Sequence, residues 1–114
     1  MPTVAGMADH LLVMTTTPDR ESAARIASSA VAQRLAATTQ VRGPVASYFW
    51  HLGEAGEGEE WIVTFKTTAA RYDQLEAHIR AEHPWDKPEV TGIELARGSA
   101  DYLRWMETAT APEA

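Results

Sequence analysis

Two segments near the middle of the chain, residues 45–52 (VASYFWHL) and 59–67 (EEWIVTFKT), both favour β structure, and only six residues separate them. The connecting GEAGEG at 53–58 has three glycines and no apolar side chain except alanine, which predicts a hairpin loop. Side chains alternate between the two faces of a strand, so Val63 and Phe65 are expected to share one face of the returning strand. The chain must therefore fold around an antiparallel hairpin.

The segments before the hairpin predict one further strand, a helix and the start of the hairpin's first strand. Residues 10–16 form a short apolar run that ends before Pro18-Asp19, which predicts a buried strand. Residues 20–37 carry small apolar side chains at steps of three and four, which predicts a helix capped by Asp19. Residues 38–42 are β-prone and are closed by Gly43-Pro44.

The segments after the hairpin continue with a helix, a strand and a last helix. Residues 69–82 have the helical period, and His83-Pro84 ends this helix because the residue before a proline avoids the helical region. Partial alternation over residues 89–96 predicts a strand. Residues 100–109 predict a short helix, with Ser99 as its cap.

The order of these elements indicates an α+β fold, a ferredoxin-like βαββαβ sandwich with an extended hairpin and a C-terminal helix. We expect one domain over residues 9–109, a flexible N-terminal tail at 1–8 and a C-terminal tail at 110–114. Two helices cover only one face of such a sheet, and the chain carries nine aromatic residues (four Trp, three Tyr and two Phe). Because partners usually cover large apolar patches, these features predict an oligomer.

Composition argues against several classes of protein. The chain has no cysteine, which removes disulfides, thiolate metal sites and cysteine nucleophiles. Its net charge is −6, whereas a nucleic-acid-binding protein needs a basic stripe. No uncharged stretch approaches the ~18 residues that would span a bilayer, and residues 1–8 lack the basic region of a signal peptide. We therefore expect a cytoplasmic protein that binds neither nucleic acid nor a membrane.

Six segments in order also carry a family resemblance: TTTPDRESAARIA (15–27), QRLAATTQV (33–41), SYFWHLGE (47–54), IVTFKTT (62–68), EHPWDKPEV (82–90) and GSADYLRWM (98–106). Over residues 11–106 the chain resembles the CutA family, small proteins linked to divalent-cation tolerance. The resemblance implies a ferredoxin-like homotrimer, similar in architecture to the PII signalling trimers and assembled through its β-hairpins and sheet edges. It also implies a response to metal ions, with copper binding in some members.

The candidate metal ligands are His83 and Glu82. The family's copper ligands are attributed to a first-strand cysteine, where this chain has Thr15, and to a histidine near a His-Pro-Tyr motif, which here reads His83-Pro84-Trp85. A threonine hydroxyl is a poor ligand for a soft ion such as Cu(I), so the expected ion is Cu²⁺ or Zn²⁺ on His83 and carboxylates. The alternative is that His83 donates a hydrogen bond to a helix-terminal carbonyl and shapes the turn at Pro84.

A second candidate site would take a small anion. Lys66 ends the third predicted strand before a helix N-terminus, where free backbone N–H groups favour negative charge. Thr15 lies at the first strand–helix junction, and Trp85 and Glu89 would complete a cleft between subunits. The alternatives are an ion pair for Lys66 and turn-stabilising hydrogen bonds for the Thr15 hydroxyl.

Catalytic patterns are absent from the sequence, which predicts a non-enzymatic protein. There is no nucleophile-elbow motif and no pair of carboxylates in an apolar setting. We expect a homotrimer that binds a divalent metal ion or a small anion between subunits. The alternatives are a structural or signalling trimer that docks a partner protein without a metal ligand, and an enzyme.

Overall fold

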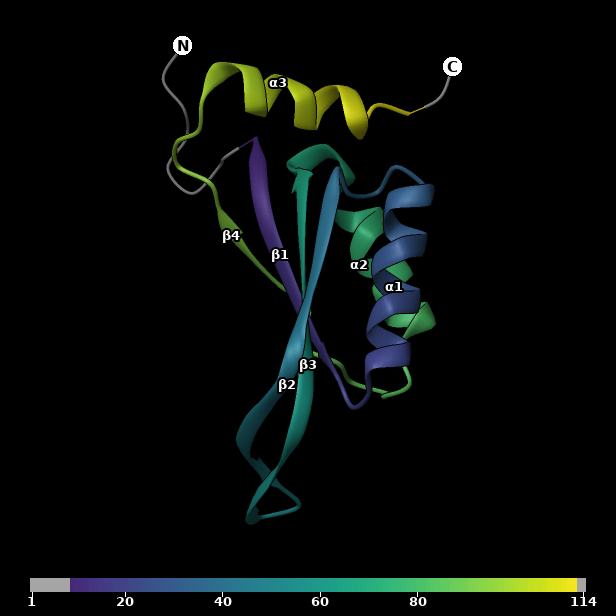
Figure 1. Cartoon of the computed structure of the whole chain (residues 1–114), viewed down its shortest axis with the longest axis vertical. Coiled ribbons are helices and arrows are strands. Elements are labelled where there is room, and N and C mark those ends of the chain that lie inside the picture. Colours follow the sequence, from purple (N-terminus) through teal and green to yellow (C-terminus); the bar gives the residue numbers. More distant parts are fainter. Residues whose placement is uncertain (1–8, 113–114) are drawn as a thin grey trace.

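The computed structural model describes residues 9–112, which form a four-stranded antiparallel sheet with two helices on one face (Figure 1). The strands are β1 (His10–Thr17), β2 (Thr38–His51), β3 (Glu54–Thr68) and β4 (Thr91–Glu94). The helices are α1 (Arg20–Ala32), η1 (Ala69–Arg71, a 3-10 turn), α2 (Tyr72–Glu82) and α3 (Ala100–Ala109). The strand order β2-β3-β1-β4 is that of the expected ferredoxin-like α+β fold.

The core lies between the sheet and helices α1 and α2. Pairing places Val13 opposite Phe65 on neighbouring strands, so both side chains point to the helical face, and both are fully buried. Helix α1 contributes Ile26 and a row of small residues, which lets its axis approach the sheet closely. Helix α2 contributes Leu75 and Ile79, both fully buried. One apolar core thus holds the sheet and the two helices together.

Helix α1 begins where the sequence predicts but ends earlier. The Asp19 side chain accepts a hydrogen bond from the Ser22 N–H at 2.7 Å, and this bond lowers the pKa of Asp19. The helix stops at Ala32 instead of residue 37 because Arg34 adopts a left-handed conformation with φ 59°. The Leu35 N–H then bonds back to the Ala30 carbonyl at 2.9 Å, which closes the helix end.

The hairpin is longer and its turn is tighter than predicted. His51 pairs with Glu54, so only Leu52 and Gly53 form the loop, and both have positive φ (52° and 80°). Such two-residue loops match the twist of the flanking strands. The predicted loop at 53–58 is therefore wrong, because all but its first residue belong to β3. The glycine-rich segment allows the Phe49 ring to lie on Gly56, where an added Cβ would come within 2.9 Å of the ring.

The remaining boundaries differ in detail from the sequence prediction. The expected strand over 89–96 is paired only from Thr91 to Glu94. The predicted tail at 1–8 lies outside the described residues. The expected C-terminal tail starts with Thr110, which is buried and donates its hydroxyl to the Met106 carbonyl at 2.8 Å.

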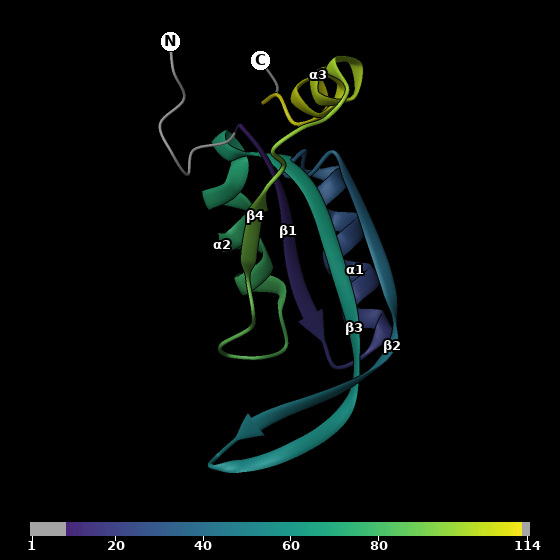
Figure 2. The same cartoon turned by 90° about the vertical axis from the view of Figure 1, so that its left-hand side faces the viewer.

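The second face of the sheet has no helix along its length. Figure 2 shows α1 and α2 on one side of the sheet and α3 across one end. Leu12 is paired with Lys66 on one side and with Ile93 on the other, so the three residues share this open face, where Ile93 is 61% exposed. Helix α3 reaches only the end of the face, where the Tyr102 ring lies 5.8 Å from the Lys66 Nζ. Within residues 9–112, no helix is long and apolar enough to cross a membrane.

Candidate functional site

His83, the predicted metal ligand, anchors the loop that follows α2. Its side chain is buried, and Nε2 lies 2.7 Å from the Thr16 carbonyl oxygen at the end of β1. A carbonyl can only accept, so Nε2 carries the proton and donates it. The other ring nitrogen, Nδ1, accepts a hydrogen bond from the backbone N–H of Trp85 at 3.0 Å. Both nitrogens are thus engaged within the chain, and an ion can reach one only if a hydrogen bond opens.

The carboxylates expected beside His83 also have partners within the chain. Glu82 Oε1 lies 4.0 Å from the Arg25 Nε, and the Glu82 carbonyl accepts a hydrogen bond from Arg25 at 3.1 Å. Glu89 accepts the Thr91 hydroxyl at 2.8 Å. Among residues 9–112, no group of three or more His, Cys, Asp or Glu side chains is placed to hold a metal ion. The described residues of one chain therefore do not fit a resident metal centre.

The structure separates the residues of the predicted anion site. Thr15 is fully buried on the helical face, and its Oγ1 has no hydrogen-bond partner among the described residues. Lys66 lies on the open face and pairs with Leu12, four residues along β1 from the Thr16 carbonyl that holds His83. At about 3.3 Å per residue, Leu12 and Thr16 lie about 13 Å apart along β1, and so do the positions of Lys66 and His83 beside them. Thr15, Lys66 and His83 do not meet in one chain.

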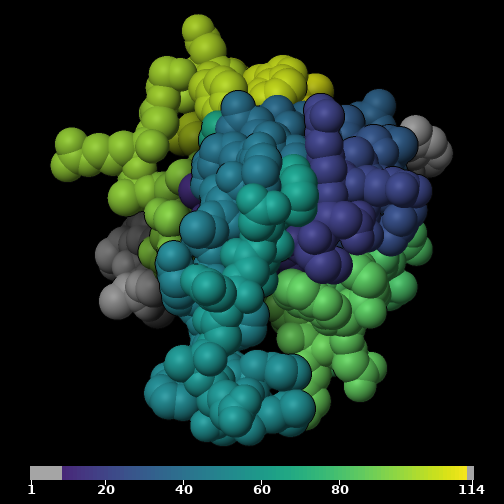
Figure 3. All heavy atoms as spheres, turned by 60° about the horizontal axis from the view of Figure 1, so that its bottom comes forward, coloured from purple at the N-terminus to yellow at the C-terminus, as the bar shows by residue number. Residues whose placement is uncertain are grey.

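Trp85 lines a cavity within the single chain, and the other lining residues are not those of the predicted cleft between subunits. The cavity has a volume of about 800 Å³ and lies between the hairpin and the loop after α2 (Figure 3). Its lining residues come from two segments: Phe49, Trp50, His51 and Glu60 from the hairpin, and Trp85, Asp86 and Lys87 from the loop. The aromatic density of residues 48–50 was the sequence signal for this wall, yet only the curvature of the hairpin brings it to the loop (Figure 2).

His83 gives this cavity a fixed wall. Its ring lies 5.3 Å from the Trp85 ring, centroid to centroid, and it also accepts the Trp85 N–H. Since His83 is itself bonded to β1, the backbone of Trp85 is anchored through His83, and the Trp85 indole lies beside the His83 ring and lines the cavity. The arrangement can orient and enclose a ligand, and it provides no nucleophile paired with a general base.

Comparison with known proteins gives one consistent family. The family model described as CutA1 divalent ion tolerance protein matches residues 11–109. The divalent-cation tolerance protein CutA of Thermus thermophilus is 32% identical over 87% of this chain and 96% of its own length. The chloroplastic protein CutA 1 of Oryza sativa is 30% identical over 88% of this chain, which spans 56% of that relative.

A solved structure gives the same result for the fold. The crystal structure of CutA1 from Oryza sativa aligns with a TM-score of 0.88 at 28% sequence identity. The alignment covers 93% of this chain and 97% of that chain. The likeness therefore extends over the sheet, the helices and the hairpin together.

Proposed function

Because this chain belongs to the CutA1 divalent ion tolerance family, we propose that it acts in divalent-cation tolerance as a non-enzymatic homotrimer. The observation that carries the proposal is the projecting end of the hairpin, residues 45–60, called the arm below (Figure 1). Tyr48, Trp50 and Leu52 of the arm are 75%, 79% and 90% exposed. Large apolar side chains at such exposure are typical of a surface that another chain covers.

The sheet offers two edges and one face for this assembly. Strands β2 and β4 are the edges, and β2 presents fourteen residues, Thr38–His51, with one side unpaired in the single chain. Unpaired edge strands readily join another strand, because their N–H and C=O groups lack partners. The open face adds apolar surface from Leu12, Ile62 and Ile93. We propose that three copies join through arms and edges and bury the open faces between them.

In this proposal the divalent cation is a ligand held between subunits. One chain supplies no complete ligand set among its described residues, so a second chain must contribute. The last residue of α2 and the loop that follows offer Glu82 and Glu89, which are both exposed and have one side-chain partner each within the chain. Carboxylates with a few added ligands suit Zn²⁺, Cu²⁺ or Mn²⁺.

Two measurements on the full chain test this function. Native mass spectrometry should give three times 12.5 kDa, about 37.5 kDa. Calorimetric titration of that species with Zn²⁺ and Cu²⁺ should show saturable binding that Glu89→Gln weakens. The matched control is Glu76→Gln, which removes a carboxylate from α2, outside the loop. A 12.5 kDa species contradicts the assembly, and silent titrations of the trimer contradict the cation site.

A second function is favoured by the tip of the arm. Among residues 9–112, Leu52 is the most exposed large apolar residue, and it lies in the two-residue turn between His51 and Glu54. An apolar tip beyond the body suits a trimer that docks a partner protein without a metal ligand. Recovery of a stoichiometric partner, lost in Leu52→Asn, together with silent calorimetry would favour this function over cation binding.

A further inference from the structure

We propose that a small cavity between α2 and the segment before β4 binds a phosphate group. The cavity has a volume of about 250 Å³ and is lined by Glu76, Arg80, Lys87, Pro88 and Val90. None of these residues belongs to the arm, to the edge strands β2 and β4 or to the open face, so the contacts proposed for the homotrimer lie elsewhere. The proposal is also independent of the cation site, since it uses a different set of residues.

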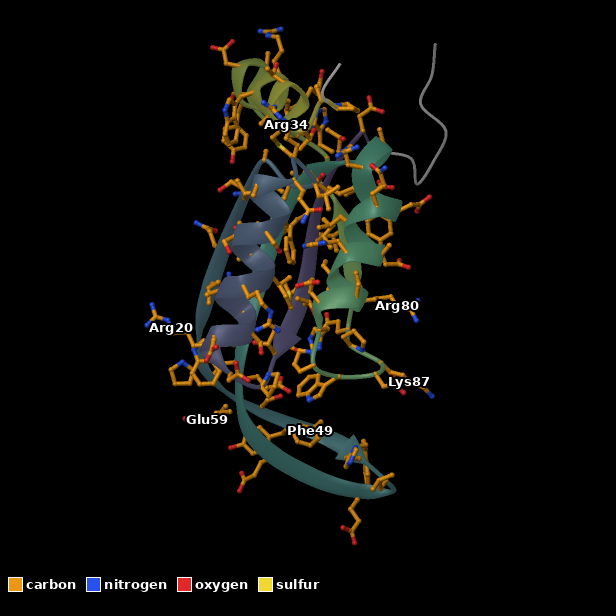
Figure 4. The ribbon with its side chains drawn as sticks, turned by 90° about the vertical axis from the view of Figure 1, so that its right-hand side faces the viewer. Arg20, Arg34, Phe49, Glu59, Arg80 and Lys87 are labelled. Carbon is orange, nitrogen blue, oxygen red and sulfur yellow. The ribbon has the colours of Figure 1, made fainter. Side chains whose placement is uncertain are left out.

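The charged groups in the lining select the sign of the ligand. Arg80 and Lys87 contribute two positive charges and Glu76 one negative charge, which leaves a net +1. Both cationic side chains are exposed and point outward on the same side of the molecule (Figure 4). Neither forms an ion pair or a hydrogen bond among residues 9–112. A positive cavity on a chain whose total charge is −6 favours an anionic ligand at this place.

The one carboxylate in the lining is engaged away from the arginine. A glutamate four residues before an arginine on a helix has the spacing at which the two side chains usually pair. Here Glu76 Oε1 instead accepts a hydrogen bond from the Tyr72 hydroxyl at 2.9 Å, one turn toward the start of the helix. Glu76 therefore does not neutralise Arg80, which stays available to an external anion.

The acidic neighbours of Lys87 in the sequence also stay out of the cavity. Asp86 lines the separate cavity beside the arm, which Lys87 borders as well. Glu89 accepts the Thr91 hydroxyl at 2.8 Å and does not line the cavity at α2. The two cations thus share this cavity with no acidic group except Glu76 among the described residues.

The core holds in place the two elements that carry the cations. Helix α2 is fixed by Leu75 and Ile79, which are both fully buried. The segment that carries Lys87 is fixed by Val90, which packs against the same core. The backbone on both sides of the cavity is therefore ordered before a ligand arrives, and only two long side chains lose freedom on binding.

A phosphate group suits an arginine and a lysine better than a carboxylate does. The planar guanidinium offers two parallel N–H donors to two phosphate oxygens, and the lysine ammonium adds a point charge. A phosphate group carries about −1.5 to −2 charge at neutral pH, so it can engage both cations. The volume of about 250 Å³ is below the roughly 300–1,000 Å³ of sites that enclose drug-sized ligands. The cavity therefore suits the phosphate group alone, whether free or at the end of a larger molecule.

Three anions test the proposal on the full-length protein. Inorganic phosphate, glycerol 3-phosphate and acetate are titrated at neutral pH and constant ionic strength, and the amide NMR signals of residues 76–90 report binding. Phosphate should bind saturably and at least about fivefold more tightly than acetate, which carries a single charge. Tighter binding of the ester would identify a phosphorylated small molecule as the ligand, and equal affinities would identify free phosphate. Absence of saturable phosphate binding, or equal binding of acetate, would overturn the proposal.

Charge-matched variants locate the binding. Arg80→Gln and Lys87→Gln each remove one cation from the lining and should weaken phosphate binding about fivefold or more. Arg20→Gln is the matched control, because Arg20 is also exposed, has no ion-pair partner within residues 9–112 and points to the opposite side of the molecule (Figure 4). Glu76→Gln removes the one negative charge and should tighten binding. Equal weakening by Arg80→Gln and Arg20→Gln would indicate attraction to the net charge alone and overturn the proposal.

Discussion

The two ends of the β2–β3 hairpin share one ladder of hydrogen bonds but lie in opposite surroundings. In the body, Val41 pairs with Val63 and Thr39 with Phe65, and the β3 residues of both pairs are fully buried. In the arm, Tyr48 and Trp50 occupy the same strand and are mostly exposed. An isolated two-stranded ribbon is only marginally stable in water. The difference indicates that the body is stabilised by its own core, whereas the arm has no comparable core of its own among the described residues and would gain one only from another chain in the proposed homotrimer.

Truncating one phenylalanine in each region should show the largest contrast. Phe65→Ala empties the centre of the core and should cost about 3–5 kcal/mol of unfolding free energy. Phe49→Ala removes a ring that is 41% exposed and should cost about 1–2 kcal/mol. Urea denaturation of both variants at one protein concentration measures the two losses. Equal losses would mean that the arm belongs to the same core as the body.

His83→Ala tests the joint between the two regions. It removes two hydrogen bonds and leaves the Thr16 carbonyl without its donor, which should cost about 1–3 kcal/mol. Because both ring nitrogens already have partners, the affinity for Zn²⁺ or Cu²⁺ should stay within about twofold of that of the parent protein. Loss of a metal ligand would lower the affinity by far more. Denaturation and calorimetry give the two values. A large loss of cation affinity would identify His83 as a ligand.

Two threonines in β1 test how the body handles buried polar groups. Thr15 Oγ1 has no partner within residues 9–112, whereas Thr17 Oγ1 donates to the Asp19 carbonyl at 2.8 Å. Thr15→Val keeps the shape, removes the unpaired hydroxyl and should stabilise the protein by about 1 kcal/mol. Thr17→Val should destabilise it by a similar amount. Thermal melts of the pair should therefore shift in opposite directions, and a lowered melting temperature of Thr15→Val would show that Thr15 is hydrogen-bonded in solution.

The smallest expected effect lies at the tip of the arm. Leu52 holds φ 52°, a conformation that bulky residues adopt at a cost and asparagine tolerates. Leu52→Asn should therefore stabilise the hairpin by about 0.5–1 kcal/mol. Gly53→Ala, at φ 80°, should have the opposite effect. Hydrogen exchange of the arm amides, at a protein concentration low enough to separate the chains, reports both changes, and destabilisation by Leu52→Asn there would contradict the backbone-strain argument.

Most of the fold could be predicted from the sequence, because it depends on local patterns. The caps at Asp19 and Ser99 are confirmed, and each accepts a backbone N–H. The errors occur where a conformation is unusual for its residue. Arg34 ends α1 without the usual glycine, and Leu52 begins the turn without the usual asparagine. The run of glycines at 53–58 indicated the loop, although most of it forms strand.

The candidate site was harder to predict, because it depends on how distant segments meet. Adjacency in sequence suggested His83 and Trp85 as parts of one site, and in the structure the Trp85 backbone N–H does bond to His83. It could not show that the Thr16 carbonyl holds the second ring nitrogen of His83, or that Lys66 lies at the far end of the sheet. Phe49 and Glu60 reach Trp85 only through the curvature of the arm, which no local pattern encodes.

Hydrogen–deuterium exchange of the arm tests most directly whether other chains cover it. The experiment compares amides of residues 45–60 with those of β1 and the inner part of β3, at high and at hundredfold lower protein concentration. We predict that the arm amides are protected nearly as well as the body at high concentration and lose protection first on dilution. Rapid exchange of the arm at every concentration, with a protected body, would contradict the account.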